Sequence, residues 1–288
     1  MRSSNFLNLW RGLTALALLG FLSAPQAAET GLLWKITSPN GTISHVFGTI
    51  HVDDSRVTQF SPPLLKALEG SDVFMMETLP PSDPSLYFLK DYNLRDQLSD
   101  DLWEKARGLA EQHAMHEDTL LHMKPWLLAM LFDLPEPQSP LTQDVLLYAK
   151  AGELGKSVEG LEDPAAHFTM LDTLSRGEQL TILRTVLGHS EEEKKHDYEA
   201  LLQAYLTGNA DDIARIDEKA TSSELPPALW QKIRTRLIDE RNAVMAKRIA
   251  ERAASSRLFV AVGAAHLAGK DGILGRLRKA GYKVAVAQ

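Results

Sequence analysis

The sequence ends in a strand–helix–strand unit, and this unit restricts the possible folds more than any other segment. Residues 258–262 read LFVAV, the most apolar strand candidate in the chain, and residues 283–287 read KVAVA. A helical pattern over about residues 271–280 lies between them. Two strands joined through one helix run in the same direction, with a right-handed crossover. The unit therefore predicts a parallel pair of strands and an α/β fold.

A β-hairpin is expected near the N-terminus. The β-favouring runs LLWKIT and ISHVF occupy residues 32–37 and 43–47. Asn40 and Gly41 lie between them, and an Asn-Gly pair readily adopts the positive φ angles of a tight turn.

Two further strands are expected at residues 73–76 (VFMM) and 158–161 (VEGL), while helical patterns dominate about residues 80–255. With 44% apolar residues, the chain can bury a full core. The predicted fold is a central, mostly parallel mixed sheet flanked by helices, with a large helical insertion and the N-terminal hairpin. Residues 29–288 are expected to form a single domain.

Residues 1–28 have the pattern of a secretory signal peptide. Arg2 and Arg11 precede the apolar run LTALALLGFL at residues 13–22, and small residues follow up to Ala28. The run is too short to span a bilayer comfortably, although a retained anchor is the alternative. We therefore expect export to the periplasm or secretion, and a mature protein that does not span a membrane.

The charge and the absence of cysteine exclude several kinds of partner and site. Loss of residues 1–28, which hold two arginines and no acid, changes the formal charge from −7 to −9. So acidic a chain is poorly suited to neutralising phosphates, which argues against nucleic acid or anionic lipid as a partner. Without cysteine, any metal site must consist of His, Asp and Glu.

The spacing Gly-x-x-His occurs twice, at Gly48 to His51 and at Gly263 to His266. With 18 Gly and 9 His in 288 residues, chance alone predicts about 0.6 occurrences, so the spacing by itself is weak. Each copy, however, directly follows an apolar strand. The glycine lets the backbone turn sharply, and the histidine lies just beyond the carboxyl end of the strand, where binding sites form in parallel sheets.

Two acids occupy similar places, Glu77 after VFMM and Glu162 after VEGL. If the strands are parallel neighbours, His51, Glu77, Glu162 and His266 converge on one edge of the sheet. Imidazoles and carboxylates suit a divalent transition metal such as zinc, manganese or cobalt, and such a metal assists hydrolysis. Each residue taken singly is more simply explained as a polar side chain that stabilises a turn.

Arg241 and Asn242 lie within a long helical pattern. A buried arginine needs a carboxylate partner, which a glutamate of the candidate site could provide. The alternative is a surface salt bridge.

Seven segments, in order from about residue 32 to 286, carry a resemblance to a known family. They are LWKI, VFGTIHV, FMMETL, KPWLLAM, GKSVEGLED, ERNAVMAKRI and FVAVGAAHLAGKDGILGRLRKAGYKV. In these segments the chain resembles the TraB/GumN family, which is related to the Tiki metalloproteases and to the erythromycin esterase/ChaN-like superfamily.

The resemblance implies a central sheet flanked by helices and a divalent-metal site. His51, Glu77 and His266 match the functional His, Glu and His of the family, and Glu162, Arg241 and Asn242 match further family positions. Tiki-type relatives are metal-dependent peptidases.

The sequence thus leads to the hypothesis of a periplasmic metal-dependent hydrolase, a peptidase acting on peptides or other small extracytoplasmic substrates. His51 and His266 would bind the metal, Glu77 would be a ligand or the general base, and Arg241 would steady a carboxylate or a developing oxyanion. Two alternatives stay open: a peptide- or glycan-sequestering protein without turnover, and a metal chaperone or sensor.

Overall fold

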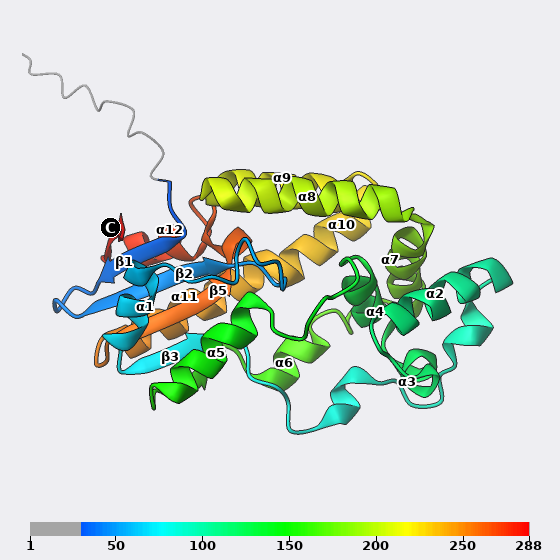
Figure 1. Cartoon of the computed structure of the whole chain (residues 1–288), viewed down its shortest axis with the longest axis horizontal. Coiled ribbons are helices and arrows are strands. Elements are labelled where there is room, and N and C mark those ends of the chain that lie inside the picture. The colour runs from blue at the N-terminus through cyan, green and yellow to red at the C-terminus, as the bar shows by residue number, and fades with distance from the viewer. Residues whose placement is uncertain (1–29, 288) are drawn as a thin grey trace, which may run out of the picture.

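The computed structural model describes residues 30–287, and its centre is a six-stranded sheet with the order β4-β3-β5-β2-β1-β6 (Figure 1). The strands are β1 Leu33–Thr37, β2 Ile43–Thr49, β3 Val73–Met76, β4 Ser157–Gly160, β5 Leu258–Gly263 and β6 Lys283–Val286. The neighbours β4, β3, β5 and β2 are parallel, and β1 is antiparallel to both β2 and β6. The predicted mixed, mostly parallel α/β sheet is confirmed.

The N-terminal hairpin is also confirmed. β1 and β2 pair in register from Leu33 opposite Phe47 to Thr37 opposite Ile43. Gly41 has a φ of +92° in the connecting turn, a conformation that a side chain would disfavour.

The prediction that the last two strands form a pair is wrong. β5 and β6 run in the same direction, but β2 and β1 lie between them and β6 pairs with β1. The burial of the two strands gives the reason. Every residue of β5 from Leu258 to Val262 is buried, as in a central strand, whereas β6 alternates exposed and partly buried residues, as suits an edge.

Helices make up most of the remaining chain. They are α1 Pro62–Glu69, α2 Asp100–Gln112, α3 Glu117–His122, α4 Pro125–Phe132, α5 Gln143–Glu153, α6 Pro164–Thr169, α7 Arg176–Gly188, α8 Glu191–Thr207, α9 Ala210–Ser222, α10 Pro227–Arg234, α11 Glu240–Ala253 and α12 Ile273–Lys279. The group α2, α3, α4 and α7 lies to one side of the sheet. In Figure 1, α8 and α9 run along the top, from above the sheet to this helical group.

Two hydrophobic clusters cover the two faces of the sheet. On β5, Leu258, Val260 and Val262 join the cluster that contains residues of α11 and α12. Phe259 and Ala261 point to the opposite face and join residues of α1 and α5. Successive side chains of a strand point to opposite faces, and full burial of one large apolar side chain contributes about 1.5–3 kcal/mol. The central strands are therefore held firmly, and so are the residues that directly follow them.

Between residues 30 and 287, no helix combines the length and the apolar character needed to cross a bilayer. The predicted signal peptide, residues 1–28, lies outside the described residues.

Candidate functional site

The parallel order of four strands brings their carboxyl ends to one edge of the sheet. Glu77 directly follows β3, His51 and Glu162 lie two residues beyond β2 and β4, and His266 lies in the short 3₁₀ turn Ala264–Leu267 after β5. Because β4, β3, β5 and β2 are consecutive neighbours, the four residues share this edge.

Gly263 lies among three of these side chains. The Gly263 amide donates to Glu77 Oε1 at 2.7 Å, and this oxygen is 3.8 Å from His266 Nε2. A Cβ atom on Gly263 would lie 3.2 Å from Glu77 Oε1 and 3.6 Å from His51 Nε2. The missing side chain therefore leaves space that His51, Glu77 and His266 border.

Gly48, the other motif glycine, has a different role. A Cβ atom there would lie 2.8 Å from Leu267 Cδ1 and 3.1 Å from Ala264 Cα. Gly48 thus allows the turn that carries His266 to pack directly against β2.

Arg241 is the buried centre of the site. Its Nη2 lies 2.5 Å from Glu77 Oε2 and 2.8 Å from Glu162 Oε2, and its Nε also donates to Glu162. Its Nη1 donates to the Leu237 carbonyl oxygen at 3.3 Å and lies 3.2 Å from His266 Nε2. All five N–H groups of the guanidinium therefore have partners. Of the two sequence alternatives for Arg241, the structure shows the buried one.

A π-helical segment, Thr235–Asp239, joins α10 to α11 directly before Arg241. Such segments widen one helical turn and occur often at functional sites. Arg241 and Asn242, adjacent in the first turn of α11, are both buried and both contact His266.

The ionisation of Glu77 is decided by its neighbours. Burial raises the pKa of Glu77, but the positive charges of Arg241 and of His51 outweigh burial and hold the pKa far below its usual value. Glu77 is therefore an anion at neutral pH.

His266 is a neutral imidazole. Its Nδ1 lies 2.8 Å from Asn242 Oδ1, an atom that can only accept, so Nδ1 carries the proton. The Nε2 lone pair faces Arg241 and Glu77. Burial is the main cause that lowers the pKa of His266 to about 4.

His51 has the opposite charge preference. Its Nδ1 lies 2.7 Å from Oδ2 of Asp144, a buried residue at the start of α5 whose Oδ1 accepts from Thr49 Oγ1. The Asp144 carboxylate raises the pKa of His51 to about 9. The side chain of His51 is 59% exposed, so it forms the solvent side of the site.

This pair gives a pH-dependent prediction. We expect Asp144→Asn to lower the pKa of His51 from about 9 toward its ordinary 6.5, as measured by the histidine NMR signals of the metal-free protein during a pH titration. Folding raises the pKa of His51, so the His51–Asp144 pair stabilises the folded protein fully below pH about 6.5. This contribution to the free energy of unfolding is lost as the pH rises through about 9. Asp96→Asn, at an exposed position outside the site, is the control. An unchanged His51 pKa in Asp144→Asn would contradict the assignment.

The donor set fits a divalent metal in its chemistry. Both imidazoles bind an oxygen acceptor through Nδ1, which fixes the ring, as second-shell residues do in metal sites. Nε2 of His51 faces the open side of the site, whereas Nε2 of His266 lies 3.2 Å from Arg241 Nη1, which a bound metal would have to displace. With Glu77 Oε1, these nitrogens supply the imidazole and carboxylate ligands that zinc, cobalt or manganese accept.

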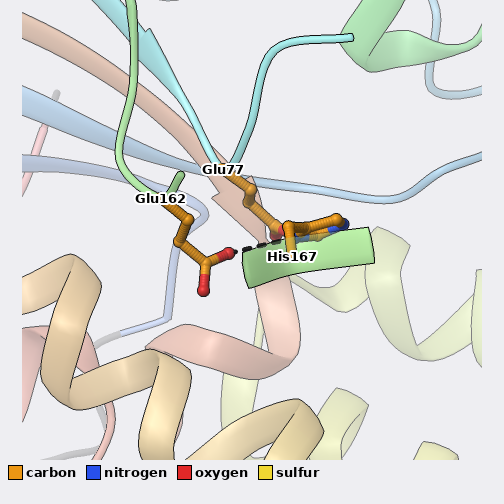
Figure 2. A group of neighbouring side chains, drawn as sticks. All are labelled: Glu77, Glu162 and His167. Atoms are coloured by element: carbon orange, nitrogen blue, oxygen red, sulfur yellow. Dashed lines mark hydrogen bonds and ion pairs between the residues drawn. The ribbon is translucent and has the colours of Figure 1, made fainter. Parts of the chain in front are cut away.

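A second group of possible ligands lies beside the first. Within residues 30–287, donor atoms of Glu77, Glu162 and His167 lie within 4.8 Å of one another, while His51 and His266 do not join Glu77 in such a group (Figure 2). The Arg241 guanidinium bonds to both glutamates and lies 3.4 Å from His167 Nδ1, so a cation of the chain itself already balances one of the two negative charges.

Sequence reasoning missed Asp144 and His167. His167 in α6 binds Glu162 through Nδ1 at 3.1 Å, and its place five residues after a candidate acid was the available signal. The only signal at Asp144 was its position as an acidic residue in the first turn of a helix. Acidic residues are common there because they interact favourably with the helix dipole, so the position did not indicate a function.

The comparisons with known proteins confirm the family that the sequence resembles. The model of the TraB/PrgY/gumN family matches residues 32–286. An uncharacterized protein of Treponema pallidum (strain Nichols) is 23% identical over 300 residues, which cover 93% of this chain and 89% of that protein. Since the family match includes all six strands and every residue of the site, the chain belongs to the TraB/PrgY/gumN family.

Proposed function

We propose that this chain is a metal-dependent hydrolase that cleaves peptides outside the cytoplasm. One observation carries the proposal: two histidines, each with Nδ1 bound to an oxygen acceptor, border the same space as the anionic carboxylate of Glu77. The relation of the TraB/GumN family to the Tiki metalloproteases, which the resemblance implies, supports peptide as the substrate, and the predicted signal peptide supports an extracytoplasmic location.

The residues of the site divide into ligands and positioning groups. His51, His266 and Glu77 would hold the metal, which supplies an acidified water and a polarised carbonyl. Asp144 and Asn242 hold the two imidazoles in orientation. The low pKa of Glu77 favours the role of ligand, because a general base works best with a pKa near the working pH.

Arg241 is a positioning residue in this proposal. Its guanidinium could donate to a developing oxyanion only if one of its present partners were released, since all five N–H groups are engaged. Its proposed role is to hold the Glu77 carboxylate in place and to balance the charge of Glu162.

Metal binding tests the proposal directly. We expect the purified protein to bind manganese, cobalt or zinc at one site, and the His51→Ala, His266→Ala double variant to bind at least about 100-fold more weakly, because two of the ligands are lost. Isothermal titration with each metal measures this, and a peptide-library screen with the metal restored measures cleavage.

The surface histidine variant His116→Ala is the matched control, since it removes an imidazole outside the site. Wild-type metal affinity in the double variant would refute the metal site. Metal binding without cleavage of any peptide would favour the sequestering alternative.

A further inference from the structure

Asp217 of α9 lines two cavities, one of which lies beside the candidate site. The first has a volume of about 250 Å³ and lies between α9, the α10–α11 helix and the loop after β5. The second, about 180 Å³, lies between α7, α8 and α9. Asn242, which orients His266, forms part of the wall of the first cavity. The first cavity therefore adjoins the proposed reaction centre.

The carboxylate of Asp217 has no bonded counter-ion in the described part of the chain. Within residues 30–287, its side chain makes no hydrogen bond and no ion pair; only its backbone oxygen accepts from Thr221 Oγ1. Burial, together with the charges of Asp133 and Glu218, raises the pKa of Asp217 to about 6, although the positive charge of His51 acts in the opposite direction. The residue keeps partial exposure to the cavities. A bound cation would relieve this unfavourable state.

The rest of the first cavity also favours a positive ligand. Glu218 and Arg234 neutralise each other at 3.8 Å, which leaves Asp239 as a second unpaired carboxylate among the described lining residues. Lys270 is the opposing cation, but it is exposed at the rim and makes no ion pair in the described chain.

Trp230 supplies an aromatic wall to the same cavity. An indole attracts an ammonium or guanidinium by about 0.5–2 kcal/mol and also packs against the apolar stem of a lysine or arginine. The volume of about 250 Å³ is below the roughly 300–1,000 Å³ of pockets that enclose a whole drug-sized ligand, so it suits a single side chain.

We propose that Asp217 and Asp239, with Trp230, form a subsite for a lysine or arginine side chain of the substrate. The inference rests on the proposed function in one respect, namely that the bound side chain belongs to the peptide that is cleaved.

Calorimetry on the full protein tests the subsite without turnover. The probes are N-acetyl-lysine methylamide and N-acetyl-norleucine methylamide, which share a linear stem and differ in the terminal ammonium. We expect the lysine probe to bind at least about 10-fold more tightly, and this preference to disappear in Asp217→Asn and to weaken in Asp239→Asn. Asp96→Asn, an exposed aspartate far along the chain, should keep the preference.

Equal binding of the two probes to the wild type, no binding of the lysine probe, or a full lysine preference in both cavity variants would overturn the subsite. Circular dichroism and thermal unfolding check that the variants are folded. The same titration on the His51→Ala, His266→Ala variant separates the two proposals: if the hydrolase proposal fails, the lysine preference and its dependence on Asp217 are still expected.

Discussion

Replacing Glu77 with glutamine is expected to lower peptide turnover by about 10²–10⁴-fold while leaving the chain folded. Glutamine has nearly the same volume, and Arg241 keeps Glu162 as a charged partner. The loss is expected whether Glu77 is a ligand or the general base. Steady-state cleavage of a peptide from the library screen, at saturating metal, measures the effect.

Metal affinity separates the two roles of Glu77. If Glu77 is a ligand, Glu77→Gln also weakens metal binding; if Glu77 is the base, metal affinity stays at the wild-type value while turnover falls. Glu69→Gln, at the exposed end of α1, makes the same chemical change outside the site and should keep full activity. Wild-type turnover in Glu77→Gln would exclude Glu77 from the chemistry.

Replacing Arg241 with methionine is expected to lower the free energy of unfolding by about 3–5 kcal/mol. The Arg241 side chain is 10% exposed, and its removal takes from the carboxylates of Glu77 and Glu162, 11% and 8% exposed, the guanidinium that bonds to both. Denaturant unfolding followed by circular dichroism, with metal removed, measures the change. Arg241→Lys should lose less, since it keeps the charge but not the five donors.

Two further variants show that burial is the cause. Arg257→Met breaks an ion pair with Asp72 whose side chains are 59% and 46% exposed, and it should lower the free energy of unfolding far less than Arg241→Met does, because solvent screens an exposed pair. Glu162→Gln combined with Arg241→Met should recover part of the lost stability, because one uncompensated carboxylate is removed. A change below about 1 kcal/mol in Arg241→Met would contradict a buried ion-pair network.

Features of the fold that depend on short stretches of sequence could be predicted. The β1–β2 hairpin depends on Asn40 and Gly41 between two β-favouring runs, and the structure confirms it. The strands before Glu77 and Glu162 were likewise found from their apolar runs. The pairing of β6 was predicted wrongly, because a helix between two strands fixes their direction but not their neighbours.

The candidate site shows the same division. The sequence placed His51, Glu77, Glu162 and His266 after strands, since the position of a residue after a strand is a local property. Their partners are remote: His51 and Asp144 are 93 residues apart in the chain, and Arg241 and Glu77 are 164 apart.

The sequence alone thus determined the α/β class, the hairpin and the strand-end positions of four candidate residues, because hydrophobic periodicity and turn chemistry act over a few residues. Only the tertiary structure decided which strands are neighbours, that Arg241 is a buried partner of two glutamates, and that Asp144 and Asn242 orient the histidines. These features depend on contacts between residues that are far apart in the chain. Such contacts form only when the sheet has assembled, so no local sequence pattern predicts them.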